Sequence, residues 1–266
     1  MALIPDAPAP RAVMSDDGLA LATYDFGGDL SDDAPVVLAV HGFASSAVAN
    51  WQATGWVREL SRAGYRVIAI DQRGHGRSAK PHDPAMYSME LLVADVAAVI
   101  DDYLLDEITF VGYSLGGRVG WHSAVALPHR ITRAVLGGIP DGLPLTRFRI
   151  AEARAFIASG TAIDDALTNA YVTMASSIVG NDLSALVALV EGMHAGTQPD
   201  PADPPQQPVL FATGSDDSIL EKSRALAAVT PRAEFYEIPG RNHFNAPTSR
   251  HFRDRALEFL TTSDRR

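Results

Sequence analysis

Runs of consecutive apolar residues recur along this chain, and stretches with helical periodicity lie between them. Apolar runs without polar alternation are typical of parallel strands buried on both faces. Strands are predicted at Leu19–Phe26, Val36–Val40, Tyr65–Ile70, Ile108–Val111, Ile131–Gly138, Val209–Thr213 and Ala233–Ile238. Helices are predicted at Trp51–Ala63, Ser88–Leu104, Arg118–Leu127, Ile219–Val229 and Pro247–Leu260, the last with proline in its first turn. Strands that alternate with helices through short connections indicate an α/β fold, with a mostly parallel central sheet flanked by helices.

The pattern changes between residues 141 and 208, where no strand is predicted. Three helical stretches are expected there, near Thr146–Ala158, Asp164–Ile178 and Leu183–His194, followed by a proline-rich linker at 198–208. Because the buried-strand pattern resumes at residue 209, we interpret 141–208 as a helical cap inserted into one core made of residues 1–140 and 209–266. The alternative is a further layer of that core. The first ten residues are expected to form an unstructured arm.

Composition narrows the classes of function. The 266 residues carry a formal net charge of −10, which argues against a nucleic-acid surface and against binding to anionic membranes. The chain contains no cysteine, so disulfides, thiolate metal sites and cysteine nucleophiles are excluded. Its N-terminus lacks the pattern of a signal peptide, and no stretch approaches the roughly 18 apolar residues of a membrane span. We therefore expect a cytoplasmic protein with no nucleic-acid or membrane partner.

The segment Gly112-Tyr113-Ser114-Leu115-Gly116 joins the predicted strand that ends at Val111 to the helix predicted from Arg118. A sharp turn between a strand and a helix needs glycine beside its apex, because the backbones approach closely there. A serine at the apex is then held with its hydroxyl exposed at the carboxyl end of the strand, which is the arrangement of a nucleophile elbow. The alternative is a glycine-rich turn that carries a solvated serine.

A serine hydroxyl becomes a nucleophile when a histidine accepts its proton, and the histidine needs a carboxylate that fixes its tautomer. Three histidines stand in predicted loops close to glycines, namely His41, His75 and His243. Only His243 follows Ser114, and the order serine, acid, histidine accompanies this kind of elbow. His243 is therefore the predicted base.

The acid is expected after the strand at 209–213, where Asp216 and Asp217 stand side by side. A carboxylate at this point lies at the same edge of the sheet as Ser114. We prefer Asp217 because Gly-x-x-Asp is the usual spacing. Asp216 and Asp141 are the alternatives, and for both of these the competing interpretation is a carboxylate that caps a turn or a helix.

Two backbone N–H groups are needed to hold the negative oxygen of a tetrahedral intermediate. One is predicted to be that of Leu115, directly after the nucleophile. The other must come from the loop after the strand at 36–40, where Phe43 is the natural donor and Gly42 permits a tight turn.

These segments resemble the α/β-hydrolase superfamily in their order and rough spacing, over a region from Leu19 to Leu260. The resemblance is carried by His41-Gly42-Phe43, Asp71-x-Arg-Gly-x-Gly-x-Ser78, Gly112-Tyr-Ser-Leu-Gly116, Gly-x-x-Asp217 and Asn-His243. It implies a central parallel sheet, a helical cap over the active site and a Ser-Asp-His triad. It also implies that His41, Asp71, Arg73 and His75 organise loops and do not act as catalysts.

Two features separate this chain from branches of the superfamily. Haloalkane dehalogenases and epoxide hydrolases of this fold use an aspartate at the elbow, where this chain has Ser114, so alkyl-enzyme ester chemistry is not expected. The single glycine after His41 differs from the His-Gly-Gly-Gly of the hormone-sensitive-lipase type. The chain is more similar to small esterases, lactonases, carbon–carbon bond hydrolases and cofactor-free perhydrolases.

The expected function is a serine hydrolase that cleaves a carboxylic ester or lactone through an acyl-enzyme, with neither metal nor organic cofactor. A carbon–carbon bond hydrolase, a perhydrolase and a small-molecule receptor with a slow triad are the alternatives. A small-molecule substrate with an apolar moiety is expected, because the predicted cap is rich in apolar residues, among them Phe148, Phe156, Leu167, Tyr171, Met174, Leu186 and Met193. The competing interpretation of this set is packing of the cap onto the core. By analogy, the protein is a monomer or a homodimer.

Overall fold

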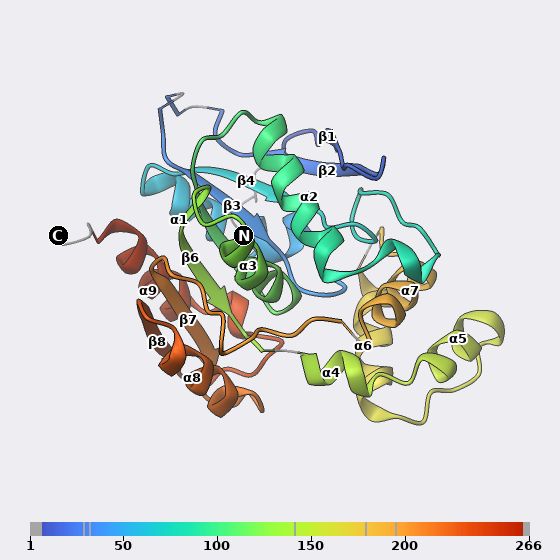
Figure 1. Cartoon of the computed structure of the whole chain (residues 1–266). Helices are drawn as coiled ribbons and strands as arrows, with labels where there is room; N and C mark the ends of the chain where they lie inside the picture. Colours follow the sequence, from blue (N-terminus) through green and yellow to red (C-terminus); the bar gives the residue numbers. More distant parts are fainter. Residues whose placement is uncertain are drawn as a thin grey trace, which may run out of the picture.

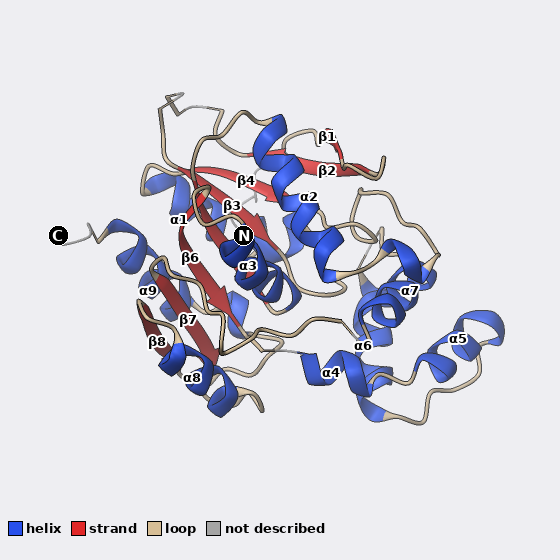
Figure 2. Cartoon of the chain, viewed as in Figure 1, coloured by secondary structure: helices blue, strands red, loops and turns tan. Residues whose placement is uncertain are grey.

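The computed structural model describes residues 7–28, 30–31, 33–140, 142–178, 180–194 and 196–262. In this part of the chain, a central eight-stranded sheet has the order β1-β2-β4-β3-β5-β6-β7-β8 (Figure 1). Strands β3 to β8 pair in parallel, and β2 is antiparallel to both β1 and β4. Helices connect the parallel strands (Figure 2). The predicted α/β fold with a mostly parallel sheet is confirmed.

The predicted strands are present, with bounds that differ by no more than two residues. The strands are β1 Arg11–Met14, β2 Ala20–Asp25, β3 Val36–Val40, β4 Arg66–Ile70, β5 Ile108–Tyr113, β6 Ile131–Gly137, β7 Val209–Gly214 and β8 Ala233–Ile238. β1 is missing from the sequence prediction. It is a four-residue edge strand in which only Val13 is buried, so it carries almost no periodic signal. The predicted N-terminal arm lies partly outside the described residues, at positions 1–6.

The helices follow the prediction with three corrections. The stretch predicted near Thr146–Ala158 is divided, because one helix, Gly142–Arg147, ends before the next one, Ile150–Ser159, begins. Trp51–Ala63 is not one helix, because Gly55, with φ of +86°, separates a π-helical turn from α1. Pro247 belongs to a separate 3-10 turn, and Ser249 caps the final helix. Ser88 caps α2 as predicted. The elements are η1 Val48–Gln52, α1 Trp56–Arg62, η2 Pro84–Met86, α2 Met89–Asp102, α3 Leu115–Ala126, α4 Gly142–Arg147, α5 Ile150–Ser159, α6 Ala166–Ser177, α7 Leu183–Met193, α8 Leu220–Val229, η3 Ala246–Thr248 and α9 Arg250–Thr261.

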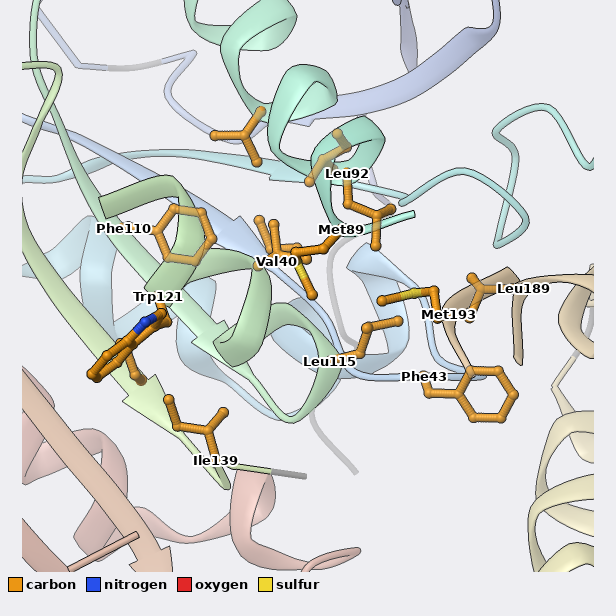
Figure 3. Packing of buried hydrophobic residues seen from close by; sticks show 14 of the residues in the cluster. Val40, Phe43, Met89, Leu92, Phe110, Leu115, Trp121, Ile139, Leu189 and Met193 are labelled. Carbon is orange, nitrogen blue, oxygen red and sulfur yellow. The ribbon is translucent and has the colours of Figure 1, made fainter. Parts of the chain in front are cut away.

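The sheet is buried on both faces, as its uninterrupted apolar runs predict. All five residues of β3 are buried, and alternate residues belong to two separate clusters, Leu38 to one and Val37 to the other. The first cluster includes residues of α2 and α3 and is drawn in Figure 3, and the second includes residues of α1 and α9. Burial on both faces fixes the strand register and holds the carboxyl ends of the strands at one edge.

Helices α4 to α7 follow β6 and precede β7, and we refer to residues 142–194 as the α4–α7 segment. They lie together at one end of the molecule, away from α8 and α9 (Figure 1). Leu186, Leu189 and Met193 of α7 are buried in the same cluster as Phe43 and Leu115 (Figure 3). The α4–α7 segment is therefore packed against the loop that follows β3 and against the start of α3.

Candidate active site

Ser114 lies between β5 and α3 in a backbone conformation that few residues adopt, with φ of +54° and ψ of −117°. Its N–H donates to the Gly137 oxygen at 2.8 Å, and its own carbonyl accepts the Arg118 N–H at 2.9 Å. The turn is therefore held from the neighbouring strand on one side and from α3 on the other. These contacts maintain the strained turn and keep Ser114 at its apex.

Three side chains from separate loops meet at this turn. His243 Nε2 lies 2.9 Å from Ser114 Oγ, and His243 Nδ1 lies 2.8 Å from Asp217 Oδ2. The second carboxylate oxygen of Asp217 accepts the Ile219 N–H at 3.1 Å, which fixes the orientation of the acid. The Asp217 side chain is only 1% exposed, whereas that of His243 is 15% exposed. The arrangement can take a proton from Ser114 and stabilise the resulting imidazolium.

Of the two alternative acids, Asp216 does not join this arrangement. Asp216 is exposed and its Oδ1 accepts a hydrogen bond from the Ser215 hydroxyl. Asp141 lies outside the described residues. Asp217 follows β7 and His243 follows β8, so the parallel sheet brings both loops to the edge where Ser114 follows β5.

The two predicted oxyanion donors belong to segments that touch. A Cβ on Gly116 would lie 2.1 Å from the Val40 oxygen, so only glycine lets the first turn of α3 lie directly against the end of β3. A Cβ on Gly42 would lie 3.3 Å from the Cβ of Ser114. Leu115 is the first residue of α3, and the N–H of such a residue has no acceptor within the helix.

A pair of buried histidines holds the loop that carries Phe43. His75 Nε2 accepts the Ala44 N–H at 3.0 Å, and His41 Nε2 accepts the Gln72 N–H at 3.2 Å. A backbone N–H can only donate, so the proton of each ring is on Nδ1, which faces a backbone oxygen. Burial lowers the pKa of His41 below 6.5 and that of His75 well below it. Both rings are neutral, and their centroids lie 4.9 Å apart.

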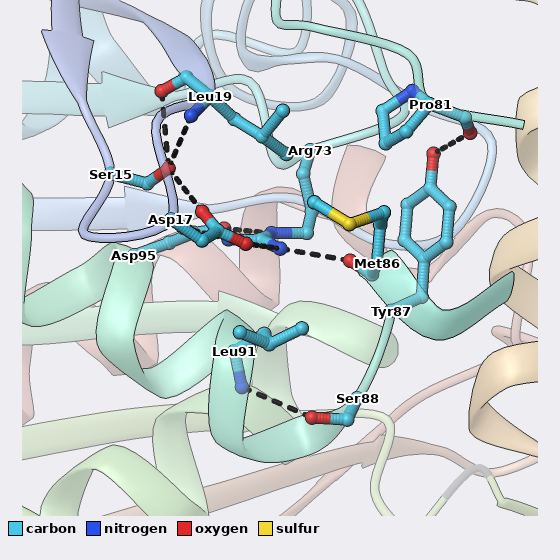
Figure 4. A network of polar contacts seen from close by, with 10 residues as sticks. All are labelled: Ser15, Asp17, Leu19, Arg73, Pro81, Met86, Tyr87, Ser88, Leu91 and Asp95. Carbon is cyan, nitrogen blue, oxygen red and sulfur yellow. Dashed lines mark hydrogen bonds and ion pairs between the residues drawn. The ribbon is translucent and has the colours of Figure 1, made fainter. Parts of the chain in front are cut away.

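The loop at residues 71–78 supports the same region. Asp71 accepts the Ala47 N–H at 2.7 Å and the Arg77 N–H at 2.8 Å, so one carboxylate joins this loop to the one after β3. Arg73, which is fully buried, forms hydrogen bonds with Asp95 of α2 and with Asp17 (Figure 4). These contacts match the loop-organising roles that the family resemblance implies for Asp71, Arg73 and His75.

The charges in this network affect one another. The hydrogen bond from Arg73 lowers the pKa of Asp17. Burial raises the pKa of Asp95, because it removes the carboxylate from water, although the guanidinium opposes this effect. Burial also acts to lower the pKa of Arg73, but the two carboxylates outweigh it and raise that pKa. Arg73 therefore remains a cation and anchors the loop to α2.

A cavity of about 110 Å³ opens beside Ser114 and His243. Its lining comes from the loop after β3, from η1, from α6 and the turn that follows it, and from the loops that carry Ser114 and His243. The residues that line it are Gly42, Phe43, Ser45, Asn50, Tyr113, Ser114, Tyr171, Met174, Ile178, His243, Phe244 and Pro247. The lining is therefore largely apolar and aromatic, with a few polar groups near the nucleophile.

Of the seven apolar residues that we singled out in the predicted cap, Tyr171 and Met174 line this cavity. Phe148, Tyr171 and Leu186 line a second, much smaller apolar cavity of about 10 Å³. Phe43 and Tyr171 are common to both cavities and therefore border both the space beside Ser114 and the small apolar space.

Two asparagines that the sequence analysis did not single out lie in this region. Asn50 lines the cavity, and Asn181 donates from Nδ2 to the Ala44 oxygen at 2.9 Å. Neither stands in a motif with a periodic or spaced signal. Their positions depend on contacts between segments far apart in the chain, so only the folded structure identifies them.

Among the described residues, no group of three or more His, Asp or Glu side chains is arranged to hold a metal ion. Within the same residues, no helix has the length and apolar character that crossing a membrane requires.

A family model described as the alpha/beta hydrolase fold matches residues 35–180. Epoxide hydrolase B of Mycobacterium tuberculosis is 39% identical over 106 residues, which are 40% of this chain and 29% of that protein. A putative 2-succinyl-6-hydroxy-2,4-cyclohexadiene-1-carboxylate synthase of Bacillus subtilis is 32% identical over 127 residues, which are 48% of this chain and 43% of that protein. The chain thus spans less than half the length of these curated relatives.

Solved structures match over nearly the whole chain. The enol-lactonase from Burkholderia xenovorans superposes with a TM-score of 0.70 at 21% identity, covering 95% of this chain and 100% of that one. A structure from a study of carboxylesterases of Nitrososphaera gargenis superposes with a TM-score of 0.75 at 17% identity, covering 94% of this chain and 97% of that one. At these identities the likeness concerns the fold.

Proposed function

Because this chain belongs to the alpha/beta hydrolase family, we propose that it is a serine hydrolase that cleaves a carboxylic ester or a lactone. The observation that carries the proposal is the hydrogen-bonded chain from Ser114 through His243 to Asp217, with distances of 2.9 and 2.8 Å. A serine so placed at the apex of a strained turn has the geometry of an activated nucleophile.

In the proposed reaction, His243 takes the proton of Ser114 while Oγ attacks the substrate carbonyl. The N–H groups of Phe43 and Leu115 stabilise the negative oxygen of the tetrahedral intermediate. His243 then protonates the departing alkoxide and leaves an acyl group on Ser114. A water molecule activated by His243 releases the acid, while Asp217 holds the imidazole in its tautomer throughout.

The residue at the elbow separates this proposal from epoxide hydrolysis, the activity named for several of the curated relatives. Epoxide hydrolases of this superfamily use an aspartate there, and its carboxylate forms an alkyl-enzyme ester. Ser114 would give an ether in the corresponding attack, and water does not hydrolyse an ether readily. Acyl transfer is therefore the chemistry that suits this elbow.

We further propose that the α4–α7 segment acts as a cap over the substrate. Tyr171, Met174 and Ile178 of this segment line the cavity that contains Ser114. No Lys, Arg, Asp or Glu is among the described residues that line the cavity, which favours a neutral substrate. A small neutral ester or lactone with an apolar part fits these walls.

Hydrolysis of a p-nitrophenyl ester series, from acetate to decanoate, tests the proposal together with labelling by a fluorophosphonate. Wild-type protein should turn over at least the short esters and be labelled, and Ser114→Ala should lose both properties. Ser45→Ala is the matched control, because Ser45 lines the same cavity but lies outside the hydrogen-bonded chain. The assignment of Ser114 as the nucleophile would be contradicted if Ser114→Ala were fully labelled. It would also be contradicted if Ser45→Ala lost labelling while Ser114→Ala kept it.

A further inference from the structure

We propose that Asn50 selects substrates in which a neutral hydrogen-bond acceptor lies close to the scissile carbonyl, by donating to that acceptor from Nδ2. The inference deepens the proposed ester hydrolysis and rests on it. It assigns a specificity role to a residue outside the predicted triad and outside the predicted oxyanion donors.

The two ends of the Asn50 amide have different surroundings. Asn50 is 6% exposed and lines the same cavity as Ser114 and His243. Its Oδ1 accepts the Gly42 N–H at 3.4 Å, whereas its Nδ2 has no hydrogen-bond partner. A backbone N–H must face an acceptor, so the amide cannot be turned over, and the nitrogen is the group that remains unsatisfied.

A buried donor without a partner costs the folded protein stability, because its hydrogen bond to water is lost and none replaces it. This cost disappears when a bound molecule supplies the acceptor. An unsatisfied donor in the wall of a reaction cavity is therefore a group that a substrate can complete, and a substrate that lacks the acceptor leaves it unpaired.

The backbone holds Asn50 firmly in this position. It lies on η1, a π-helical turn in which the Ala53 N–H donates to the Val48 oxygen, and such turns occur frequently at functional sites. The next residue, Trp51, is fully buried and packs edge-on against Trp56 with ring centroids 5.5 Å apart. Asn50 is thus fixed between the packed rings of Trp51 and Trp56 and the loop that follows β3.

The cavity also indicates which kind of acceptor fits. Ser45 and Asn50 contribute polar side chains to the lining, whereas Met174 and Ile178 contribute apolar ones. No cationic side chain is among the described residues of the lining, so a carboxylate would lose its hydration without compensation. An ether or ketone oxygen on the carbon next to the scissile carbonyl can accept the hydrogen bond and carries no charge into the cavity. Such an oxygen is present in 2-alkoxyacyl and 2-oxoacyl esters.

The test compares p-nitrophenyl methoxyacetate with p-nitrophenyl butyrate, two esters whose acyl groups have the same length and shape. Each kcat/KM is divided by the rate of alkaline hydrolysis of that ester, which removes the difference in intrinsic reactivity. Wild type should prefer methoxyacetate by about tenfold, the scale expected for satisfying one buried donor.

Asn50→Asp keeps an oxygen for the Gly42 N–H and removes the donor, and Asn50→Leu removes both groups. In each variant the preference should fall to one or below, while His82→Ala, at an exposed position outside the lining of this cavity, should retain it. The readout is the ratio of the normalised kcat/KM values for methoxyacetate and butyrate, because a loss of activity that affects both esters equally does not change this ratio.

Two results would overturn the inference. One is a wild-type ratio near one. The other is an unchanged ratio in both Asn50 variants, and if both esters then lose activity equally, Asn50 only supports the loop after β3. Ser114-dependent hydrolysis of butyrate would still uphold the proposed function in both cases. If wild type hydrolyses neither ester, the proposed function fails, and this inference fails with it.

Discussion

Asn181 Nδ2 donates to the backbone oxygen of Ala44 at 2.9 Å, so the turn between α6 and α7 is bonded directly to the loop after β3. The same amide nitrogen also contacts the Ala175 oxygen at 3.1 Å. On its other side, Ala44 donates its N–H to His75, and its φ of +58° is rare for alanine. The residue next to Phe43 is therefore held by the core and by the α4–α7 segment together.

We predict that Asn181→Ala lowers kcat for a short ester by about tenfold, because a misplaced oxyanion donor weakens binding of the transition state more than binding of the substrate. KM should change less than kcat. Steady-state kinetics with p-nitrophenyl butyrate provides the measurement. His82→Ala is the control, since it removes an exposed contact with Asp182 in the same segment. Equal losses in the two variants would show that the segment as a whole, and not the contact with Ala44, determines the rate.

The acid of the triad can be tested by two neighbouring substitutions. Asp217→Asn should lower kcat by roughly 10³–10⁴-fold, because a neutral amide no longer holds the histidine in the required tautomer. Asp216→Asn should remain within about twofold of wild type, since that carboxylate is exposed and contacts only Ser215 among the described residues. Comparison of kcat for the two variants decides the matter, and the reverse order of effects would transfer the role to Asp216.

Two buried histidines, His41 and His75, and the half-buried His122 predict a loss of stability in mild acid. Burial lowers the pKa of His41 and His75, and burial, aided by the charge of Arg118, lowers the pKa of His122 to about 4. Unfolded histidines have a pKa near 6.5, so below this pH the unfolded chain binds more protons than the folded one. The contribution of these neutral histidines to the free energy of unfolding is fully present above pH 6.5, and it is lost progressively as the pH falls toward 4.

Urea unfolding at pH 7.5, 6.0 and 5.0 measures this effect. The free energy of unfolding should decrease with pH in wild type and decrease less steeply in His122→Gln. His129→Gln, at an exposed position, should behave like wild type. A pH dependence of unfolding that is the same in all three proteins would refute the assignment to His122.

The size of the cavity predicts a preference for short acyl groups. A space of about 110 Å³ is smaller than the roughly 150 Å³ cavity that accommodates benzene in an engineered protein core. Acetate to butyrate esters should therefore be hydrolysed best. Because Tyr171 lines both this cavity and the small apolar one, Tyr171→Ala should enlarge the apolar space and shift the optimum toward longer chains.

The ester series used above measures this shift, with Phe156→Ala as the control because Phe156 lines neither cavity. Tyr171→Ala should raise kcat/KM for octanoate relative to acetate by about tenfold, in line with the 10- to 200-fold effects of single methylene groups in apolar pockets. A chain-length profile that is unchanged in Tyr171→Ala would place the acyl group elsewhere.

Local signals were sufficient for most of the fold. The uninterrupted apolar runs at 36–40 and 209–213 predict strands buried on both faces, since a strand with a solvated face would need polar residues at alternate positions. The prediction missed β1 because an edge strand buries little, and it missed the break at Gly55 because apolar residues continue on both sides of that glycine. Tertiary contacts override a periodic pattern at such points.

The candidate site likewise has one part that the sequence predicted and another part that only the tertiary structure revealed. The sequence by itself predicted the elbow around Ser114, because the sharp turn needs glycines at fixed positions beside its apex. The order of residues along the chain selected His243 and Asp217. Only the tertiary structure decided that Asn50, whose buried Nδ2 has no hydrogen-bond partner, lines the cavity and that Asn181 holds the loop beside Phe43. Single hydrogen bonds between distant segments impose no periodicity on the chain, so their partners become known only when the backbone has brought them together.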